Sequence, residues 1–326
     1  MKALQMIKYG EIRDSLSINE IEKPSIKQND ILVEVKAASL NPIDYKLVEG
    51  HLKEIVPLNL PCTIGFDVSG VVVAKGTDVS DFEIGNEVYS RVPQLQMGTV
   101  AEYVAIDSGV VAKKPTNSSF EEAAGLPLAG LTAIQSLERV GLKKNDRILI
   151  HAGSGGVGSF AIQYAKAKGA YVYTTTSTKN VAMVKALGAD RVIDYKTEDY
   201  RTIAKDLDIV FDTLGQDYTL EAFDLIKDGG KVSSIVGPLD EETAKHMGLV
   251  DYRLPENLST LINKKSATYN LTWMQPNKEQ LNTIKEYVEN GTIKPIVDKV
   301  YPFENSIEAC LYLATGRAKG KVIVSL

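Results

Sequence analysis

The second half of the chain alternates short, uniformly apolar runs with segments in which apolar residues recur every three or four positions. Uniform runs are typical of parallel strands buried on both faces, and the wider spacing is typical of helices that pack on them. The predicted strands are 147–151, 171–176, 191–194, 208–213 and 231–236. Helical segments begin near residues 159, 181 and 220. This order predicts a doubly wound parallel sheet, which belongs to the α/β class.

Short strands separated by glycine and aspartate dominate the first 114 residues instead. Glycines fall at or near the strand edges, as expected of a barrel-like β domain that turns sharply many times. The predicted strands are 31–37, 71–74, 88–90 and 101–106. A polar connector follows at 115–120, and helical character starts at Glu121.

The last third of the chain returns to strand character. Residues 238–254 are polar and fit no element, whereas 258–262, 278–289 and 307–313 have helical patterns. Strands are predicted at 269–272, 296–300 and 321–324. We expect the final segment to rejoin the first domain. The predicted organisation is a β domain of residues 1–118 and 270–326 around a parallel-sheet domain of 119–269.

A glycine motif follows the first predicted strand of the parallel sheet. Gly153, Gly155 and Gly158 fit G-x-G-x-x-G between a strand and a helix. Gly153 permits a tight turn, Gly155 lets the backbone approach a pyrophosphate, and Gly158 lets the helix pack closely. N–H groups at the helix start attract the anion. A glycine turn without a ligand is the alternative, but the strand–turn–helix–strand context favours a dinucleotide site.

The end of the second strand decides which dinucleotide is bound. An NAD site usually places Asp or Glu there, on the ribose 2′-hydroxyl. Here stand Thr176, Ser177, Thr178 and Lys179. Hydroxyls and an ammonium suit a 2′-phosphate, and one charged hydrogen bond of ~1.5–3 kcal/mol gives a roughly ten- to a hundred-fold preference for NADPH. Alternatively, Lys179 is a solvated residue near a helix start whose N-cap is Ser177 or Thr178.

Composition restricts the partners and the compartment. The chain has 326 residues and a formal net charge of -5, which argues against nucleic acid or an anionic membrane as a partner. Cys62 and Cys310 are its only cysteines, so a disulfide framework is not expected, although either thiol could be reactive. The N-terminal apolar run is too short for a signal peptide, and no 18-residue apolar stretch exists. We expect a cytoplasmic protein.

Several segments together resemble the medium-chain dehydrogenase/reductase superfamily, in its zinc-independent quinone and enone oxidoreductase branch. The matching segments are 38–46, 65–72, 98–103, 152–158, 208–215, 229–231 and 316–321. Plant-type alkenal/enone reductases are the most similar group, on the strength of 41–46, 177–179 and 235–238. The resemblance implies a GroES-like domain and a Rossmann domain, an active site in the cleft, NADPH dependence and a homodimer.

The metal ligands of the superfamily's alcohol dehydrogenases are missing. Those enzymes hold zinc through Cys and His plus a further Cys or Glu. Around the first ligand position this chain has Leu40 and Asn41, and in place of Gly-His-Glu it has Gly65-Phe66-Asp67. We expect His151 to be a satisfied buried residue or one close to the cofactor rather than a metal ligand, and His51 and His246 to lie on the surface. The sequence therefore predicts no metal.

The resemblance places Asn41, Asp44, Tyr45 and Lys46 at the mouth of the cleft, with Lys46, Asn41 and Asp44 as catalytic candidates. Lys46 would bind the nicotinamide side of the cofactor or donate to an enolate, and Asn41 would orient the ring or the substrate carbonyl. The structural alternative is that Asn41 begins a turn and that Asp44 pairs with Lys46 or caps a short helix. Tyr89, Trp273 and Met274 are candidate pocket walls or ordinary core.

Cofactor contacts follow from the motif, the resemblance and the strand ends that should share one crevice. The resemblance places Thr132 near the nicotinamide, Tyr195 by the adenosine phosphate, and the backbones of Asn270 and Leu271 near the carboxamide. The predicted contacts are Lys46, Thr132, Gly153, Ser154, Gly155, Gly156, Val157, Gly158, Thr176, Ser177, Thr178, Lys179, Tyr195, Leu214, Gly237, Asn270, Leu271 and Arg317.

Without a metal, reduction of an activated double bond is easier than oxidation of an alcohol. A quinone or an α,β-unsaturated carbonyl accepts hydride directly because the negative charge delocalises onto oxygen. The predicted function is therefore hydride transfer from NADPH to such an acceptor. Two alternatives stay open: a quinone reductase that transfers one electron at a time, and an NADPH-binding redox sensor or structural protein with little turnover.

Overall fold

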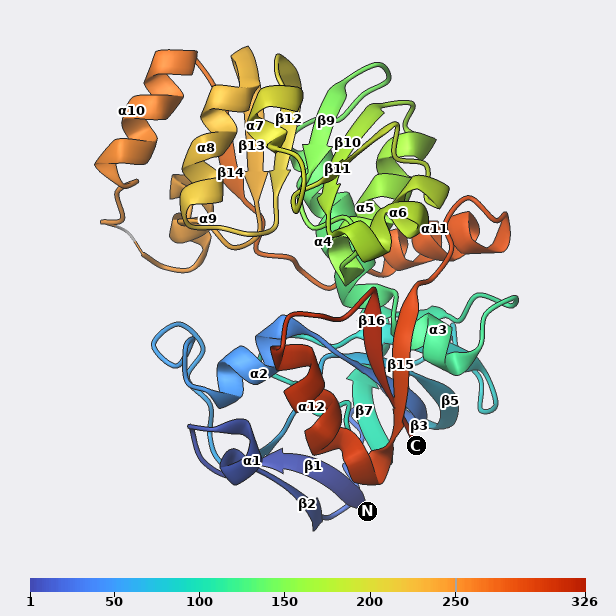
Figure 1. Ribbon diagram of the computed structural model, residues 1–326. Coiled ribbons are helices and arrows are strands. Elements are labelled where there is room, and N and C mark those ends of the chain that lie inside the picture. The colour runs from blue at the N-terminus through green and yellow to red at the C-terminus, as the bar shows by residue number, and fades with distance from the viewer. Residues whose placement is uncertain (250) are drawn as a thin grey trace. The chain divides into compact units, whose positions relative to one another are not determined.

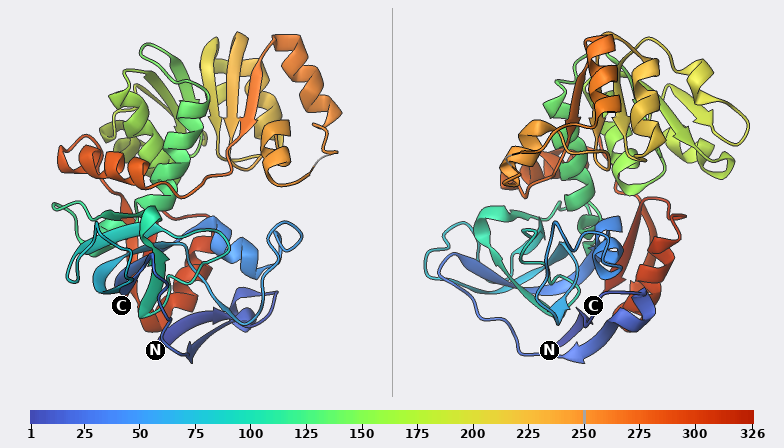
Figure 2. Two further views of the ribbon diagram at one scale, coloured as in Figure 1. Left: turned by 180° about the vertical axis from the view of Figure 1, so that it is seen from behind. Right: turned by 90° about the vertical axis from the view of Figure 1, so that its left-hand side faces the viewer.

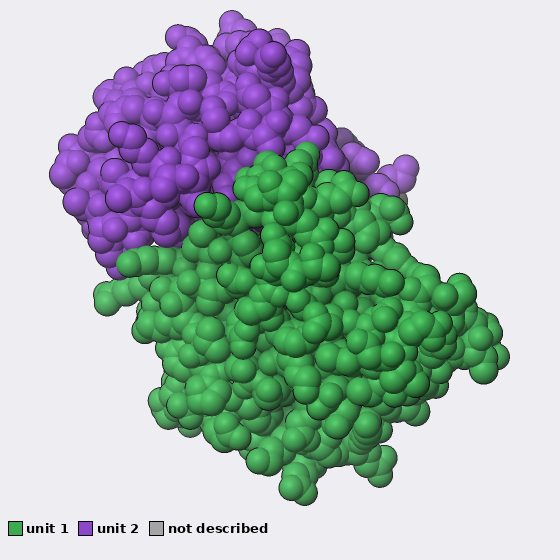
Figure 3. Space-filling view, turned by 90° about the vertical axis from the view of Figure 1, so that its right-hand side faces the viewer, with its two compact units in different colours: residues 1–131, 275–326 green, residues 132–274 purple. Residues whose placement is uncertain are grey.

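The computed structural model describes residues 1–249 and 251–326. The chain divides into two compact units, a first unit of residues 1–131 and 275–326 and a second unit of residues 132–274 (Figure 3). The sequence placed the boundaries earlier along the chain at both points.

A six-stranded parallel sheet forms the second unit, in the order β11-β10-β9-β12-β13-β14. Its strands are β9 (Arg147–Ile150), β10 (Tyr171–Thr176), β11 (Arg191–Asp194), β12 (Leu207–Asp212), β13 (Ile226–Ser234) and β14 (Thr268–Leu271). The chain moves outward from β9 to β11 and then returns to place β12 on the other side of β9. This reversal confirms the predicted doubly wound sheet, and ligands of such sheets bind beyond the carboxyl ends of the strands at the reversal.

Helices surround this sheet (Figures 1 and 2). They are α4 (Pro127–Arg139), which begins in the first unit, α5 (Gly156–Ala167), α6 (Val181–Ala186), α7 (Tyr200–Ile203), α8 (Asp217–Leu225), α9 (Glu241–His246) and α10 (Glu256–Lys265), with a short 3-10 turn η2 (Thr178–Asn180). The sequence missed α9 because its residues are polar. The side chain of Asp240 caps it by accepting from the Thr243 N–H at 2.8 Å. Position 250, in the unassigned stretch 238–254, lies outside the described residues.

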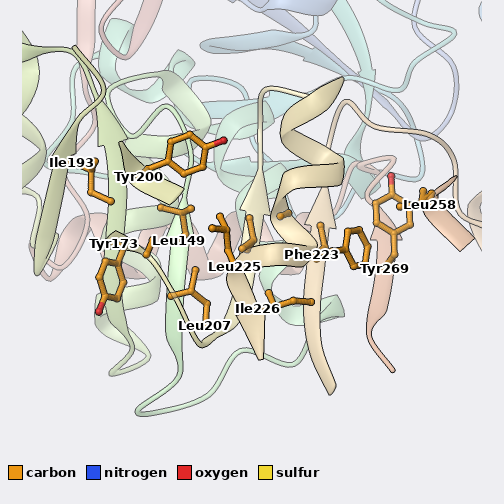
Figure 4. Close-up of a cluster of buried hydrophobic side chains, with 14 residues drawn as sticks. Leu149, Tyr173, Ile193, Tyr200, Leu207, Phe223, Leu225, Ile226, Leu258 and Tyr269 are labelled. Carbon is orange, nitrogen blue, oxygen red and sulfur yellow. The ribbon is translucent and has the colours of Figure 1, made fainter. Parts of the chain in front are cut away.

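Buried side chains from every strand of this sheet form one core cluster (Figure 4). Phe223 and Leu225 of α8 and Leu258 of α10 pack on it, and all three are nearly or completely buried. Full burial of such side chains contributes ~1.5–3 kcal/mol each. The strand members are Leu149, Tyr173, Ile193, Leu207, Val210, Ile226, Val232 and Tyr269. Ile226 begins β13, five residues before the predicted start of this strand at 231, because the strand continues through Gly229 and Gly230.

The first unit contains a seven-stranded sheet, ordered β15-β16-β3-β5-β6-β8 with β7 paired to β3, and a three-stranded sheet, ordered β2-β1-β4. The strands are β1 (Lys2–Met6), β2 (Leu16–Glu20), β3 (Asp30–Leu40), β4 (Cys62–Thr63), β5 (Asp67–Lys75), β6 (Glu87–Arg91), β7 (Tyr103–Asp107), β8 (Val111–Lys113), β15 (Val297–Pro302) and β16 (Lys321–Ser325). Antiparallel pairing of β16 with β3 confirms that the end of the chain rejoins the first unit. β1, β2, β4 and β8 were not predicted individually, since they are short or mixed in polarity.

The helices of this unit are short except for α11. They are α1 (Ile12–Ser15), α2 (Pro42–Val48), α3 (Phe120–Ala124), α11 (Lys278–Glu289) and α12 (Ser306–Ala314), with 3-10 turns η1 (Ser108–Val110) and η3 (Phe303–Asn305). A small apolar cluster of Ala37, Ala124 and Ile323 packs α3 on β3 and β16. Among the described residues, none of the helices is both long and apolar enough to cross a membrane.

Candidate active site

The three motif glycines differ in how much space a side chain would have at each position. A Cβ at Gly153 would lie 2.1 Å from Thr174 Oγ1, and one at Gly158 would lie 2.4 Å from the carbonyl oxygen of Ala152. At Gly155 the nearest atom is that same carbonyl oxygen at 3.4 Å. Gly153 and Gly158 are therefore required by packing, whereas Gly155 leaves one side of the backbone open. The left-handed residue of the turn is Ala152 (φ 49), which corrects the prediction that Gly153 supplies the turn's backbone freedom.

Helix α5 starts without a side-chain cap. Its N-cap is Gly155, which has no side chain to accept a hydrogen bond from the first turn. The first-turn N–H groups of an α-helix have no partner inside the helix, and together with the helix dipole they form an anion site. The predicted contacts Ser154, Gly156 and Val157 are partly exposed at this start. The sequence thus produces an open backbone and an uncapped helix end at one point.

The loop after β10 is tied to this turn through Asn180, a residue that the sequence analysis did not single out. Its Nδ2 donates to Ser154 Oγ at 3.0 Å and to Ser177 Oγ at 3.4 Å. The side chain is buried, and its Oδ1 has no hydrogen-bond partner. The sequence offered one indication of this role: Asn180 is three residues after Ser177, close enough for their side chains to meet in a turn. Asn180 therefore fixes the glycine turn relative to the loop that contains Lys179.

Charged groups on two strand ends surround the same loop. Lys179 and Thr178 are exposed, and hydrogen bonds from Thr178 hold the pKa of the Asp194 carboxyl below its usual range. The Thr178 hydroxyl is thus already used, and a carboxylate that the sequence analysis did not place here lies beside the loop. Tyr195 is exposed, and the ammonium of Lys196 lies 5.3 Å from its ring centroid. Lys196 is a second cation near this loop.

The predicted strand-end loops do lie at one edge of the sheet, because they follow the neighbouring strands β9, β10, β12 and β13. Large apolar side chains are exposed along this edge: Tyr195, Leu214, Tyr218 and Val236. Exposed apolar groups clustered at one place mark a ligand surface more often than chance exposure does.

Asp212, at the end of β12, holds two of these loops. Its Oδ1 accepts from the N–H groups of Leu214 and Gly215, both at 2.9 Å. Its Oδ2 accepts from the hydroxyls of Thr219 at 2.6 Å and Ser234 at 2.9 Å. Ser234 Oγ in turn accepts from the Gly237 N–H at 2.8 Å. The loops after β12 and β13 are therefore connected through one buried carboxylate.

His151, at the end of β9, is buried as predicted but only half satisfied. Its Nδ1 lies 3.2 Å from Thr175 Oγ1, and its Nε2 has no partner. The ring packs edge-on against Tyr200 and Tyr218, with centroids 5.1 and 5.6 Å away. Burial lowers the pKa of the imidazole to about 4, and the nearby carboxylate of Asp212 opposes the shift. His151 is therefore neutral at physiological pH.

The neutrality of His151 predicts a pH dependence of stability. In the unfolded chain the imidazole binds a proton below about pH 6.5, whereas in the folded protein it does so only below about pH 4. The stabilisation is complete above pH 6.5 and is lost as pH falls towards 4, by about 3 kcal/mol in total. Urea unfolding of His151→Asn should show a correspondingly smaller fall than the wild type. His246→Asn, at an exposed histidine, is the control; a parallel fall in His151→Asn and the wild type would contradict the assignment.

Not every predicted cofactor contact is free to bind. The Leu271 N–H donates to Asp240 Oδ2 at 2.6 Å, and its carbonyl accepts from Arg139 Nη1 at 2.5 Å and from Thr243 Oγ1 at 2.9 Å. This corrects the expectation that the backbone N–H of Leu271 is available to a carboxamide. The contact predicted for the Asn270 backbone stays a prediction; the side chain of this residue is buried, and its Oδ1 has no partner. Thr132 is buried, and Trp273 and Met274 are half-buried.

The catalytic candidates of the first unit lie on and before α2. Asn41 and Asp44 are buried, and Asp44 Oδ2 accepts from the Asn41 N–H at 2.7 Å, so Asp44 caps the helix as the structural alternative held. Burial raises the pKa of Asp44 to about 7, against the effect of that hydrogen bond. Lys46 is half-buried, and its ammonium forms no ion pair within the described part of the chain. Of the three side chains, only that of Lys46 is partly exposed to solvent.

Other candidates of this unit have ordinary surroundings. Tyr89 is buried, and its hydroxyl donates to the Leu281 carbonyl at 2.5 Å, which makes it core. Arg317 is exposed. Burial raises the pKa of the Cys62 and Cys310 thiols, so neither is favoured as a thiolate nucleophile.

Comparison with known proteins identifies the family. Residues 27–116 match the family described as "Alcohol dehydrogenase GroES-like domain", and residues 187–324 match "Zinc-binding dehydrogenase". A 2-methylene-furan-3-one reductase of Solanum lycopersicum is 35% identical over 99% of this chain and 79% of its own length. The chain belongs to the medium-chain dehydrogenase/reductase superfamily. An NADPH-dependent alkenal/one oxidoreductase of Arabidopsis thaliana, described as chloroplastic, is 36% identical over 99% of the chain and 79% of its own length.

Solved structures of the superfamily agree with this assignment. The quinone oxidoreductase from Coxiella burnetii has a TM-score of 0.88 and 33% identity, and it covers 100% of this chain and 99% of its own. The Escherichia coli quinone oxidoreductase complexed with NADPH has a TM-score of 0.86 at 25% identity, with 100% of both chains covered. This superfamily member is an NAD(P)H-dependent oxidoreductase of the quinone oxidoreductase and alkenal/one reductase type, with the GroES-like and Rossmann-type folds that the sequence predicted.

Proposed function

We propose that the protein transfers a hydride from NADPH to a quinone or to the C=C bond of an α,β-unsaturated carbonyl. The observation that carries the proposal is the open backbone at Gly155 next to the uncapped start of α5. Together they fit a pyrophosphate, which needs N–H donors and close approach. Buried polar atoms without partners lie in His151 and Thr176, at strand ends, and in Asn180 of η2. These atoms also fit a polar ligand at this edge.

Preference for NADPH over NADH is supported by the charges near the 177–179 loop. Lys179 is exposed there, and Lys196 adds a second cation. The carboxylate of Asp194 works against an anion, although hydrogen bonds from Thr178 occupy it. Two related proteins bear the same cofactor in their names: the Arabidopsis enzyme is NADPH-dependent, and the E. coli structure contains NADPH.

The cofactor, when bound, supplies the hydride, and the chain supplies orientation and charge. An enone or quinone places the resulting negative charge on oxygen, so a nearby cation lowers the barrier. Lys46 is the candidate donor to that oxygen or to the nicotinamide side of the cofactor. Asn41 and Asp44 contribute by holding α2, because their side chains are buried among protein partners.

Zinc does not fit the residues present. Asn41 and Asp67, at the positions where the zinc-binding members have ligands by resemblance, are bonded to each other and to the ammonium of Lys321. A cation in the donor set opposes a second cation. No group of three or more His, Cys, Asp or Glu able to hold a metal occurs among residues 1–249 and 251–326. We propose a zinc-independent reaction, whatever the name of the matched family.

Removing metal should therefore leave turnover unchanged. Protein treated with EDTA and then dialysed should oxidise NADPH with a 2-alkenal or a para-quinone at the rate of untreated protein, and faster than it oxidises NADH. The alkenal-to-quinone ratio identifies the acceptor class, and detection of semiquinone would indicate one-electron transfer. Loss of activity restored by Zn²⁺ would contradict the proposal, and tight NADPH binding without turnover on either acceptor would favour a sensor.

The homodimer and the cytoplasmic location remain predictions. Several relatives bear the words chloroplastic or mitochondrial in their names, so the compartment does not follow from membership of the family. Gel filtration with light scattering would test the dimer.

A further inference from the structure

A row of polar and charged residues crosses one end of the sheet in the first unit. β16, β3, β5 and β6 are consecutive in that sheet. Val322 pairs with Leu40, Ser39 with Asp67, and Asp67 with Arg91. Lys321 therefore begins β16 where Asn41 follows the end of β3, and Asp67 begins β5 beside them. Four strands bring these groups together although they are far apart in the sequence.

Asp67 is the centre of this row, and it is completely buried. Its Oδ2 accepts from Asn41 Nδ2 at 3.0 Å and from Lys321 Nζ at 3.3 Å. Its Oδ1 accepts from the N–H of Leu128, in the first turn of α4, at 2.8 Å. Lys321 Nζ also donates to Asn41 Oδ1. We call Asn41, Asp67 and Lys321 the buried triad.

The triad fixes the residue that starts α2. The Asn41 amide donates to Asp67 and, at 3.3 Å, to the Ser39 carbonyl, while its oxygen accepts from Lys321. The Asn41 N–H is held by Asp44 within the first turn. The side-chain amide and the backbone N–H of Asn41 are thus all hydrogen-bonded, to the side chains of Asp44, Asp67 and Lys321 and to the carbonyl of Ser39. Because Asn41 directly precedes α2, its orientation sets where Lys46 lies, little more than a turn further along.

Stability alone does not explain a buried ion pair. The Lys321 and Asp67 side chains are 7% and 0% exposed. The free energy needed to remove two such charges from water can exceed the free energy gained from their attraction. Apolar residues of similar volume often fold as well, whereas breaking one half of a buried pair is strongly destabilising. The Arg91 guanidinium is also buried at this end of the sheet, 5.0 Å from the Phe66 ring centroid. This end of the sheet therefore contains buried cations as well as buried carboxyl groups.

We propose that Lys321 is a positioning residue for the reaction: through Asn41 and Asp67, its ammonium holds α2 so that Lys46 is aligned on the reacting groups. This rests on the proposed function. Misplacement of a catalytic group by about 1 Å can lower rates by on the order of a hundred-fold. Disruption of the triad should therefore lower kcat by roughly ten- to a hundred-fold, with the NADPH Kd changed less than about twofold.

A double-variant comparison separates positioning from simple stability. Lys321→Met and Asp67→Leu each leave a buried partner unpaired and should each lower the Tm by roughly 10 °C. The double variant Lys321→Met/Asp67→Leu removes both members of the ion pair and should recover part of that Tm. Recovery stays incomplete because the Leu128 N–H loses its acceptor and Arg91 loses a neighbouring carboxylate. The kcat of the double variant should nevertheless stay low, because the Asn41 side chain then keeps only its hydrogen bond to the Ser39 carbonyl, at 3.3 Å. Lys113→Met, on the exposed end of β8 in the same sheet, is the control and should match the wild type.

Hydrogen exchange gives a readout that does not depend on turnover. In the double variant the amides of residues 43–48 should exchange at least tenfold faster than in the wild type, while those of β3 and β5 keep their protection. Recovery of Tm, kcat and α2 protection together would overturn the proposal and leave the triad a purely structural pair. If the wild type turns over no acceptor, the proposed function fails separately, and the α2 protection still decides whether the triad positions this helix.

Discussion

Replacing Gly155 by alanine is expected to weaken NADPH binding by roughly a hundred-fold while the protein stays folded. A methyl group there meets only the Ala152 carbonyl oxygen, at 3.4 Å, so the fold can accept it. The same methyl would occupy the open side of the backbone that we assign to the pyrophosphate. Displacing the anion from two N–H donors at ~1.5 kcal/mol each corresponds to about that loss. Fluorescence titration with NADPH measures the Kd, and the Tm monitors folding.

Gly158→Ala is the matched control, because it adds the same methyl group within one turn. Its Cβ would lie 2.4 Å from the Ala152 carbonyl oxygen and 2.9 Å from Gly153 Cα, so backbone must move. We expect a loss of roughly 2–4 kcal/mol in the free energy of unfolding. If Gly155→Ala instead lost stability to the same degree and bound NADPH normally once folded, the open side of Gly155 would not be the pyrophosphate site.

These contrasting glycines show what a sequence motif predicts well. G-x-G-x-x-G with its flanking strand and helix was sufficient to place the turn, the helix start and the parallel sheet, since each follows from local sequence. What local sequence could not show was that Ala152 is the left-handed residue, because alanine rarely adopts that conformation. Thr174, on the next strand, is what excludes a side chain at Gly153.

Long-range pairs were the part of the site that the sequence could not predict. Asn41, Asp67 and Lys321 come together only because β3, β5 and β16 are neighbours in one sheet. Considered singly, Asn41 looked like a substrate contact, while the structural alternative for Asp44, a helix cap, was correct. Similarly, Asp194 belongs to a different strand from the loop that it contacts, so scanning the end of β10 alone could not reveal that carboxylate.

Lys179→Ala is expected to weaken NADPH binding roughly ten- to a hundred-fold and to leave NADH binding nearly unchanged. Lys179 is exposed on η2, next to the loop that Asn180 ties to the glycine turn. An ammonium that donates to the 2′-phosphate contributes ~1.5–3 kcal/mol, and NADH has no phosphate to receive it. Titration with both nucleotides at two salt concentrations measures the effect, which should shrink at high salt because the charges are exposed.

Two neighbouring lysines make this prediction selective. Lys185, exposed in the last turn of α6, is the matched control, and Lys185→Ala should bind both nucleotides like the wild type. Lys196→Ala should give a smaller NADPH-specific loss, because its ammonium lies over the Tyr195 ring. Equal losses of NADPH and NADH in Lys179→Ala would refute its contact with the 2′-phosphate. If Lys196→Ala lost more NADPH affinity than Lys179→Ala, the 2′-phosphate contact would instead be assigned to Lys196, after strand β11. The neighbouring Asp194 carboxylate and Tyr195 would then set the cofactor preference.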